Sequence, residues 1–165
     1  MKNGFTVLLW TAILFVSCAS KTTAGQTTKA TAETTAPQPE HKGTWFRELT
    51  LQQAFETAQR EGKLVFIDCY TKTCAPCKMM IDRVFPLEVC GEYLNNAFVS
   101  IMLDMEEGEG VAVAERYNID IYPTYLILSS DGTRIGEVIG ADRDAVRFIG
   151  KIKDAVTGVK SFGGN

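Results

Sequence analysis

Apolar residues recur along the chain with two spacings, and these spacings predict a succession of helices and strands. Steps of three and four residues predict a first helix from Leu51 to Ala58, which ends at Gly62. Helical spacing returns in four later segments, which are the stretch from Cys74 to near Pro86, residues 87–96, Glu109–Tyr117 and Ala145–Val156. Apolar runs of strand length occupy residues 64–70, 98–103, 124–128 and 134–139.

The order of these segments predicts the fold class. Strands alternate with helices, which is typical of α/β proteins. The last two strands are separated by Ser129-Ser130-Asp131-Gly132, a turn sequence of the kind that joins a β-hairpin. We expect one α/β domain over residues 44–160, followed by a flexible tail at residues 161–165.

Composition and charge exclude several classes of function. With 45% hydrophobic and 22% charged residues, the chain has the composition of an ordinary globular protein. A formal net charge of −3 and the lack of a basic cluster argue against binding to nucleic acid. The only histidine, His41, precedes the first predicted helix, which removes histidine-based catalysis and metal binding from the folded region.

The first residues have the pattern of an export signal. Lys2 precedes an apolar run from Phe5 to Val16, which is too short to span a bilayer and matches a signal peptide. Phe15-Val16-Ser17-Cys18 resembles the cleavage box of bacterial lipoproteins, in which the cysteine is lipidated. We expect a signal peptide at residues 1–17 and a lipid anchor at Cys18, facing the periplasm. The alternative is an ordinary signal peptide that contains an unmodified Cys18.

Residues 18–43 are expected to form a disordered tether. They are rich in Thr and Ala, contain Pro37 and Pro39, and show no apolar periodicity. Such a segment cannot bury enough apolar surface to offset the entropy lost on ordering. Fully extended, it would reach roughly 80 Å at ~3.3 Å per residue. A linker whose length has no role is the alternative.

The motif Cys74-Ala75-Pro76-Cys77 places two thiols three residues apart at the start of a predicted helix. Unpaired N–H groups and the helix dipole stabilise a thiolate at Cys74, and Cys77 lies one turn further in. This arrangement suits disulfide exchange, with Cys74 as nucleophile and Cys77 as the thiol that resolves the mixed disulfide. The alternatives are an inert disulfide and half of a metal site, for which only Cys69 and Cys90 offer further thiols.

Four landmarks occur in the order found in the thioredoxin superfamily, which the chain resembles over residues 45–157. They are Asp68 six residues before the first cysteine, Cys74–Lys78, Tyr122-Pro123-Thr124 and Gly140. A narrower resemblance to exported thioredoxin-like lipoproteins of Bacteroidetes rests on Asp68-Cys69-Tyr70, Cys77–Met80, Val84-Phe85-Pro86 and Asp104-Met105-Glu106. The resemblance implies a three-layer α/β/α fold, in which helices cover both faces of a central mixed sheet of four to five strands.

The resemblance also assigns roles to single residues. Asp68 lies in an apolar strand, where burial raises the pKa of a carboxyl group, and would exchange a proton with Cys77. A carboxylate that only meets a buried polar partner is the alternative, and Ser100 stands where family members carry a lysine near this aspartate. The implied substrate groove consists of Thr73, Ala75, Pro76, Tyr122, Pro123 and Gly140.

Within that groove, Pro123 is implied to be a cis-proline that faces the disulfide. Gly140 would let the backbone approach the substrate closely, and an ordinary turn glycine is the alternative. Thr73 replaces the usual Trp of the family, and Ala75 replaces the usual Gly. Thr73 removes an apolar contact surface, which indicates partners other than those of ordinary thioredoxins.

These observations predict a thiol-disulfide oxidoreductase of the bacterial envelope that reduces protein disulfides. Pro76 brings the motif nearer to reducing thioredoxins than to oxidants with a His in this place. A disulfide oxidase or isomerase, and a redox-inert binding lipoprotein, are the alternatives. We expect a monomer that needs no organic cofactor or metal and receives electrons from a membrane dithiol protein. Cys69 and Cys90 are expected to be buried apolar side chains.

Overall fold

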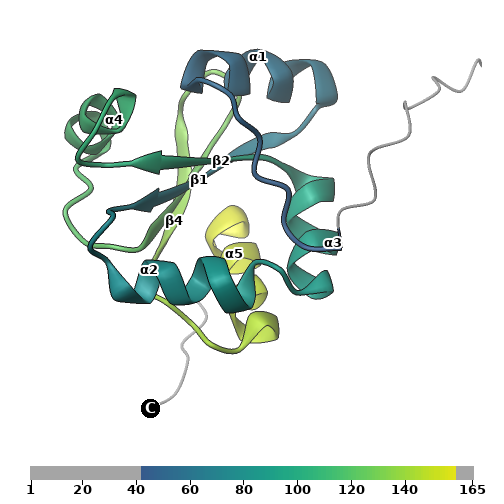
Figure 1. The fold of residues 1–165 in the computed structure, drawn as a ribbon. Helices are drawn as coiled ribbons and strands as arrows, with labels where there is room; N and C mark the ends of the chain where they lie inside the picture. Colours follow the sequence, from purple (N-terminus) through teal and green to yellow (C-terminus); the bar gives the residue numbers. More distant parts are fainter. Residues whose placement is uncertain (1–41, 159–165) are drawn as a thin grey trace, which may run out of the picture. The chain divides into compact units, whose positions relative to one another are not determined.

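The computed structural model describes residues 42–158, shown in Figure 1. The chain divides into two units, Met1–Gln38 and Pro39–Asn165, and all the described residues belong to the second unit. The expected signal peptide, Cys18, the tether up to His41 and the tail at residues 161–165 lie outside the described residues.

The sheet has four strands in the described part of the chain, in the order β2-β1-β3-β4. These are β1 (Leu64–Tyr70), β2 (Phe98–Asp104), β3 (Thr124–Leu128) and β4 (Arg134–Ile139). Strand β1 is parallel to β2 and antiparallel to β3, which is antiparallel to β4. The inner strands β1 and β3 are buried on both faces, which explains why their sequences are continuous apolar runs.

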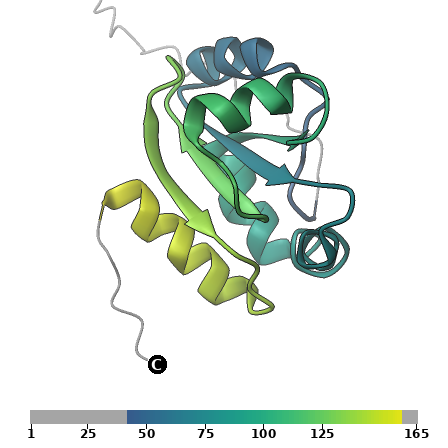
Figure 2. The same cartoon turned by 90° about the vertical axis from the view of Figure 1, so that its left-hand side faces the viewer.

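Helices cover both faces of this mixed sheet, as Figures 1 and 2 show. Helices α1 (Leu51–Glu61) and α4 (Glu109–Tyr117) pack on one face. On the other face lie α3 (Glu88–Ala97), α5 (Ala145–Thr157) and the helix that follows Cys74. Each face has its own core of buried side chains, so the predicted three-layer α/β/α fold is confirmed.

Local sequence signals fix the ends of several elements. The Thr50 hydroxyl accepts a hydrogen bond from the Gln53 N–H, and the Gln53 side chain accepts one from the Thr50 N–H, which forms a capping box at α1. At α5 a single hydrogen bond from the Arg147 N–H to the Asp144 carboxylate caps the helix. Gly132, with φ of +83°, forms the predicted turn between β3 and β4.

The helix after Cys74 differs from the single α-helix that its apolar spacing predicts. An α-helix, α2, covers only Ala75–Met79, and a π-helical turn, η1, follows at Met80–Val84. In this turn the Phe85 N–H donates to the Met80 carbonyl five residues earlier, at 2.9 Å. The wider turn places Val84 and Phe85 in the core that also contains Tyr125 and Phe148.

The chain enters the domain along α3 and the end of η1. Asn95 of α3 accepts a hydrogen bond from the Trp45 N–H at 2.8 Å and donates one to the Gly43 carbonyl at 3.0 Å. A side chain at Gly43 would collide with the backbone of Pro86, since a Cβ atom there would lie 2.6 Å from the Pro86 Cα. Beyond this point Phe46 forms a single parallel bridge to β2 at Ser100. No complete fifth strand forms within the described residues.

Candidate active site

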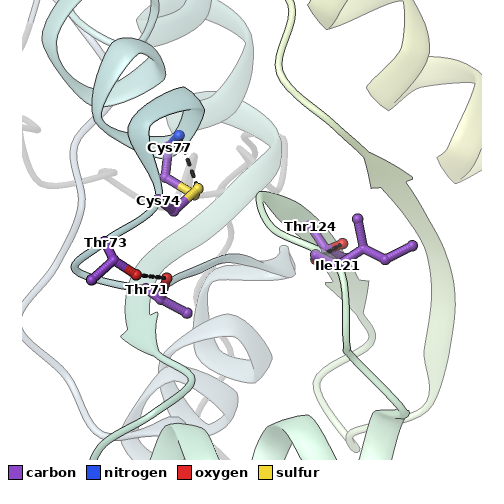
Figure 3. The surroundings of a disulfide bond; sticks show 6 residues. All are labelled: Thr71, Thr73, Cys74, Cys77, Ile121 and Thr124. Carbon is purple, nitrogen blue, oxygen red and sulfur yellow. Dashed lines mark hydrogen bonds between the residues drawn. A yellow bond between two sulfur atoms is a disulfide. The ribbon is translucent and has the colours of Figure 1, made fainter.

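Cys74 and Cys77 form a disulfide at the start of α2, with a Cα–Cα distance of 5.3 Å. Cys74 is the N-cap of the helix, and its sulfur accepts a hydrogen bond from the Cys77 N–H at 3.1 Å, as Figure 3 shows. Because this N–H group has no partner within the helix, it remains available to stabilise a thiolate on Cys74 after reduction.

The two cysteines differ in their access to solvent. Cys74 is partly exposed, whereas Cys77 is only 1% exposed and lies under the first turn of the helix. A substrate disulfide can therefore reach the Cys74 sulfur, and Cys77 can reach only a partner already bonded to Cys74. This is the asymmetry that a nucleophile and a resolving thiol require.

The loop before β3 lies across from the disulfide in Figure 3. The Tyr122–Pro123 peptide bond is cis, as the resemblance implied. The Pro123 carbonyl accepts a hydrogen bond from the Gly140 N–H at 2.8 Å, which joins the two loops of the expected groove. Gly140 has φ of +88°, a conformation that side chains with a Cβ rarely adopt, so its role is conformational.

The side chains of this loop point in different directions. Tyr122 packs against the core beneath α1 and α4, and its hydroxyl donates to the Ile119 carbonyl at 3.4 Å. Ile121 is instead 53% exposed, and in Figure 3 its side chain points away from the disulfide. On the opposite side, the Thr73 and Thr71 hydroxyls lie 3.5 Å apart.

Asp68 lies inside the protein, on the sheet face that carries α2. Its side chain is 1% exposed, and neither carboxylate oxygen has a hydrogen-bond partner among the described residues. Burial raises the pKa of Asp68 to about 7. A carboxyl group with this pKa can both accept and release a proton near neutral pH.

Two further polar groups are buried on the same face as Asp68. Tyr125 lies directly across from Asp68 in the β1–β3 pair, and Ser100 of β2 lies on the same face of the sheet. Within residues 42–158 the Tyr125 and Ser100 hydroxyls also lack hydrogen-bond partners. Burial, and secondarily the Asp68 charge, raise the pKa of Tyr125. In the β1–β2 pair Ser100 lies across from Phe66 and Met102 lies across from Asp68, so neither position brings a cation to Asp68.

Comparisons with known proteins agree with this geometry. A family model named Thioredox_DsbH, described as "Protein of unknown function, DUF255", matches residues 38–119. A solved structure of a candidate disulphide-isomerase from Bacteroides thetaiotaomicron is 39% identical, with a TM-score of 0.62. The match covers 73% of this chain and 97% of that one. The chain belongs to the thioredoxin superfamily.

Among curated proteins, thioredoxin H2-1 of Oryza sativa subsp. japonica is 37% identical over 92 residues. These residues make up 56% of this chain and 62% of the rice protein. Spermatogenesis-associated protein 20 of Rattus norvegicus is 37% identical over 82 residues, which cover 49% of this chain and 9% of the rat protein. The chain thus spans less than two thirds of the length of these two relatives.

The two other cysteines of the thioredoxin domain are both fully buried and free. Burial raises the pKa of the Cys69 thiol to about 12 and that of the Cys90 thiol to about 11. Cys69 packs beneath α1 and α4, whereas Cys90 packs in the core beneath α3 and α5. Both are protonated, inert side chains in this fold.

Other kinds of site lack support in the described part of the domain. Residues 42–158 contain no group of three or more His, Cys, Asp or Glu side chains that could hold a metal ion. In the same residues, no helix has the length and hydrophobicity needed to cross a membrane.

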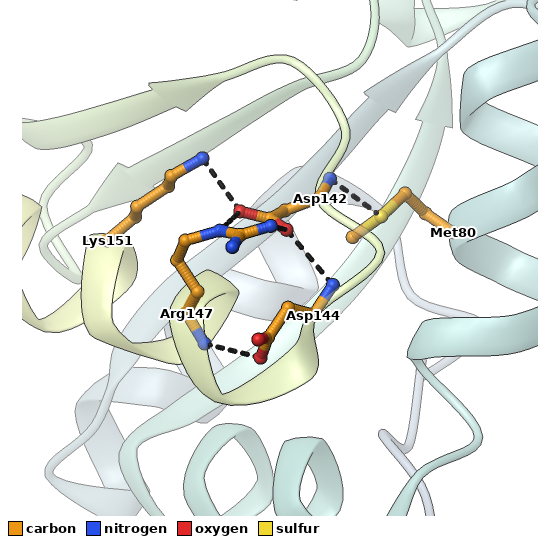
Figure 4. A network of polar contacts seen from close by, with 5 residues as sticks. All are labelled: Met80, Asp142, Asp144, Arg147 and Lys151. Carbon is orange, nitrogen blue, oxygen red and sulfur yellow. Dashed lines mark hydrogen bonds and ion pairs between the residues drawn. The ribbon is translucent and has the colours of Figure 1, made fainter. Parts of the chain in front are cut away.

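A buried carboxylate holds the loop after Gly140, as Figure 4 shows. Asp142 is 5% exposed and accepts two hydrogen bonds from the Arg147 guanidinium, at 2.6 and 2.7 Å. The Lys151 ammonium lies 2.9 Å from the same carboxylate. The Asp142 N–H donates to the Met80 sulfur at 3.4 Å and so ties the loop to η1. These contacts fix the wall of the groove opposite Pro76.

The sequence reasoning missed Asp142, because an exposed loop carboxylate has the same sequence pattern. The signal available was an acidic residue just before α5 with two cations, Arg147 and Lys151, one turn apart on that helix. Hydrogen bonds from Arg147 are the largest cause of the low pKa of Asp142. Burial acts in the opposite direction, and the hydrogen bond from Lys151 lowers the pKa further.

Asp142→Asn is expected to lower the free energy of unfolding by about 2 kcal/mol at pH 7, because it leaves Arg147 and Lys151 without their buried partner. The pKa of Asp142 is depressed in the folded state, so its carboxylate stabilises the wild type fully above the ordinary carboxyl pKa of about 3.9. The difference in free energy of unfolding between wild type and variant therefore shrinks as the pH falls below that value. Urea unfolding at pH 7 and pH 3 measures this difference. Asp154→Asn, a partly exposed change on the same helix, should stay within about 0.5 kcal/mol of the wild type.

Proposed function

We propose that this protein is a thiol-disulfide oxidoreductase of the bacterial envelope that reduces protein disulfides. The proposal rests on the disulfide between a partly exposed Cys74 and a buried Cys77 at the N-terminus of α2. The cis-proline loop across from it and Asp68 below the helix support the same chemistry.

The reaction starts from the reduced protein. The Cys74 thiolate attacks one sulfur of a substrate disulfide, the substrate S–S bond breaks, and the leaving sulfur takes a proton from solvent. The Cys77 thiol then gives its proton to the Asp68 carboxylate and attacks the Cys74 sulfur. The second substrate thiol leaves, so the substrate gains two electrons and the protein ends as the Cys74–Cys77 disulfide. A dithiol protein restores the reduced form by the reverse exchange.

The equilibrium reduction potential of the purified protein tests the direction of this reaction. With the Cys74 and Cys77 state followed by alkylation and mass in glutathione buffers, we expect a potential near about −270 mV, at the thioredoxin end of the range. A value near about −120 mV would make the protein a disulfide donor. A pair that never changes its redox state would favour a binding role for the fold.

A disulfide isomerase is the second candidate, because the Bacteroides thetaiotaomicron relative at 39% identity is described as a candidate disulphide-isomerase. Both activities begin with attack by Cys74. They differ in whether Cys77 resolves the mixed disulfide or a substrate thiol does so first. Recovery of activity from a model protein with scrambled disulfides, measured without an excess of reductant, separates the isomerase from the reductase.

The location is part of the proposal. The signal-peptide pattern of residues 1–17 and the resemblance of Phe15–Cys18 to a lipoprotein cleavage box support export and lipid anchoring. The electron donor would then be a membrane dithiol protein, since disulfides persist outside the cytoplasm unless reducing equivalents are supplied. Substrates would be proteins whose disulfides are accessible on that side of the membrane.

A further inference from the structure

An open pocket of about 420 Å³ adjoins the disulfide. One wall comes from α2 and consists of Ala75, Pro76 and Met79, and the other comes from the loop after β4 and consists of Ala141 and Arg143. Ala75 and Pro76 are the two residues between the cysteines, so a peptide bonded to Cys74 must pass this pocket.

Within residues 42–158, Arg143 is the only charged side chain that lines the pocket. It is exposed and has no ion pair or side-chain hydrogen bond to any described residue. Its two acidic neighbours in sequence are already engaged. Asp142 is bound by Arg147 and Lys151, and Asp144 caps α5.

The charge around the pocket is therefore positive, although the whole chain carries −3. The segment from Asp142 to Lys151 holds three cations and two carboxylates, and both carboxylates are used internally. Among the described residues the Arg143 guanidinium has no partner, and it lies beside an apolar surface. A guanidinium in this setting favours a carboxylate, with which it can form two hydrogen bonds.

Resting on the proposed function, we infer that this pocket selects substrates with an acidic residue near the reactive cysteine. The apolar wall receives the neighbouring part of the substrate peptide, and Arg143 pairs with its Asp or Glu side chain. The contacts of Asp142 hold Arg143 in place, since they fix the loop to α5 and to Met80. Arg143 is thus a specificity residue, separate from Cys74, Cys77 and Asp68.

The test uses the full-length protein in its reduced form and single-turnover kinetics. Its substrates are disulfide peptides in which Glu, Gln or Lys occupies each of three positions on either side of the cysteine. At one or more of these positions we expect the Glu peptide to react about fivefold faster than the Lys peptide, and the preference should shrink in 0.5 M salt. Arg143→Glu should abolish or reverse the preference.

Two controls make the result specific. Arg60→Glu makes the same charge change on α1, across the sheet from α2, and should keep the wild-type preference. Bis(2-hydroxyethyl) disulfide is small and uncharged, so its rate reports the reactivity of Cys74 alone and normalises the peptide rates in every variant. Wild-type protein that fails to reduce this compound would overturn the proposed function. Reduction without a Glu preference at any position, or a preference that survives Arg143→Glu, would overturn the pocket assignment alone.

Discussion

Cys77→Ser should convert the protein into a trap that accumulates mixed disulfides with its substrates through Cys74. Cys74 keeps its exposed sulfur and its N–H donor, so attack on a substrate proceeds. The resolving sulfur is absent, and the adduct should persist at least 100-fold longer than in the wild type, on the order expected for loss of an intramolecular thiol. Adducts are measured on non-reducing gels after acid quenching and alkylation, and they should disappear on treatment with dithiothreitol.

The matched control is Cys74→Ser, which keeps one thiol of the motif but removes the accessible one. It should form no adducts, because the Cys77 sulfur is 1% exposed. Cys69→Ser and Cys90→Ser in the Cys77→Ser background should leave trapping intact, since both thiols are fully buried. Adducts that persist in the Cys74→Ser, Cys77→Ser double variant would contradict the assignment of Cys74 as nucleophile.

Asp68→Asn should make the oxidised protein more stable at pH 8.5 than the wild type. The pKa of Asp68 rises from 3.8 to about 7 on folding, so the folded state holds its proton more tightly than the unfolded state. The wild type is then most stable below the unfolded pKa and loses stability as the pH rises toward 7. A difference of about three units between the folded and unfolded pKa values corresponds to about 4 kcal/mol of unfolding free energy. The wild type loses this stability at high pH, and the Asn variant does not.

Urea unfolding of both proteins between pH 4 and pH 8.5 measures this effect. The wild-type free energy of unfolding should fall across the range and level off above pH 7, whereas that of Asp68→Asn should stay nearly flat. Asp154→Asn serves as the control, because Asp154 lies in α5 and is partly exposed. Parallel curves for wild type and Asp68→Asn would show that Asp68 is ionised in the fold at neutral pH.

The same variant should also resolve mixed disulfides more slowly. A thiol with a pKa of about 8.5 is only a few per cent ionised at pH 7, so an internal base can gain on the order of tenfold in rate. We therefore expect Asp68→Asn to combine higher stability with lower activity.

The strands were predictable because burial on both faces leaves little freedom in composition. Residues 64–70 and 124–128 are continuous apolar runs, and these are the two inner strands. The carboxylate inside the first run was conspicuous for the same reason, and it is the buried Asp68. The hairpin turn was equally local, because Gly132 supplies the positive φ that the turn needs.

The features that escaped prediction depend on contacts between distant segments. Apolar spacing is nearly the same in an α-helix and in a single π turn, so nothing in residues 80–84 marks the change of hydrogen bonding. The burial of Asp142 depends on how α5 packs beside the loop. The Tyr125 hydroxyl has no hydrogen-bond partner within residues 42–158, and the Tyr125 ring packs between Phe66 and Phe148, which are far from it in sequence. Sequence spacing carries no information about these distances.

The close packing of Gly43 against Pro86 determines where the disulfide lies relative to the start of the domain. The chain joins the domain at the far end of the α2–η1 segment, which extends from Cys74 for roughly 15 Å at ~1.5 Å per residue. The Cys74 sulfur and Gly43 therefore lie at opposite ends of the α2–η1 segment. A partner that docks at Cys74 therefore approaches the end of this helical segment that lies away from Gly43.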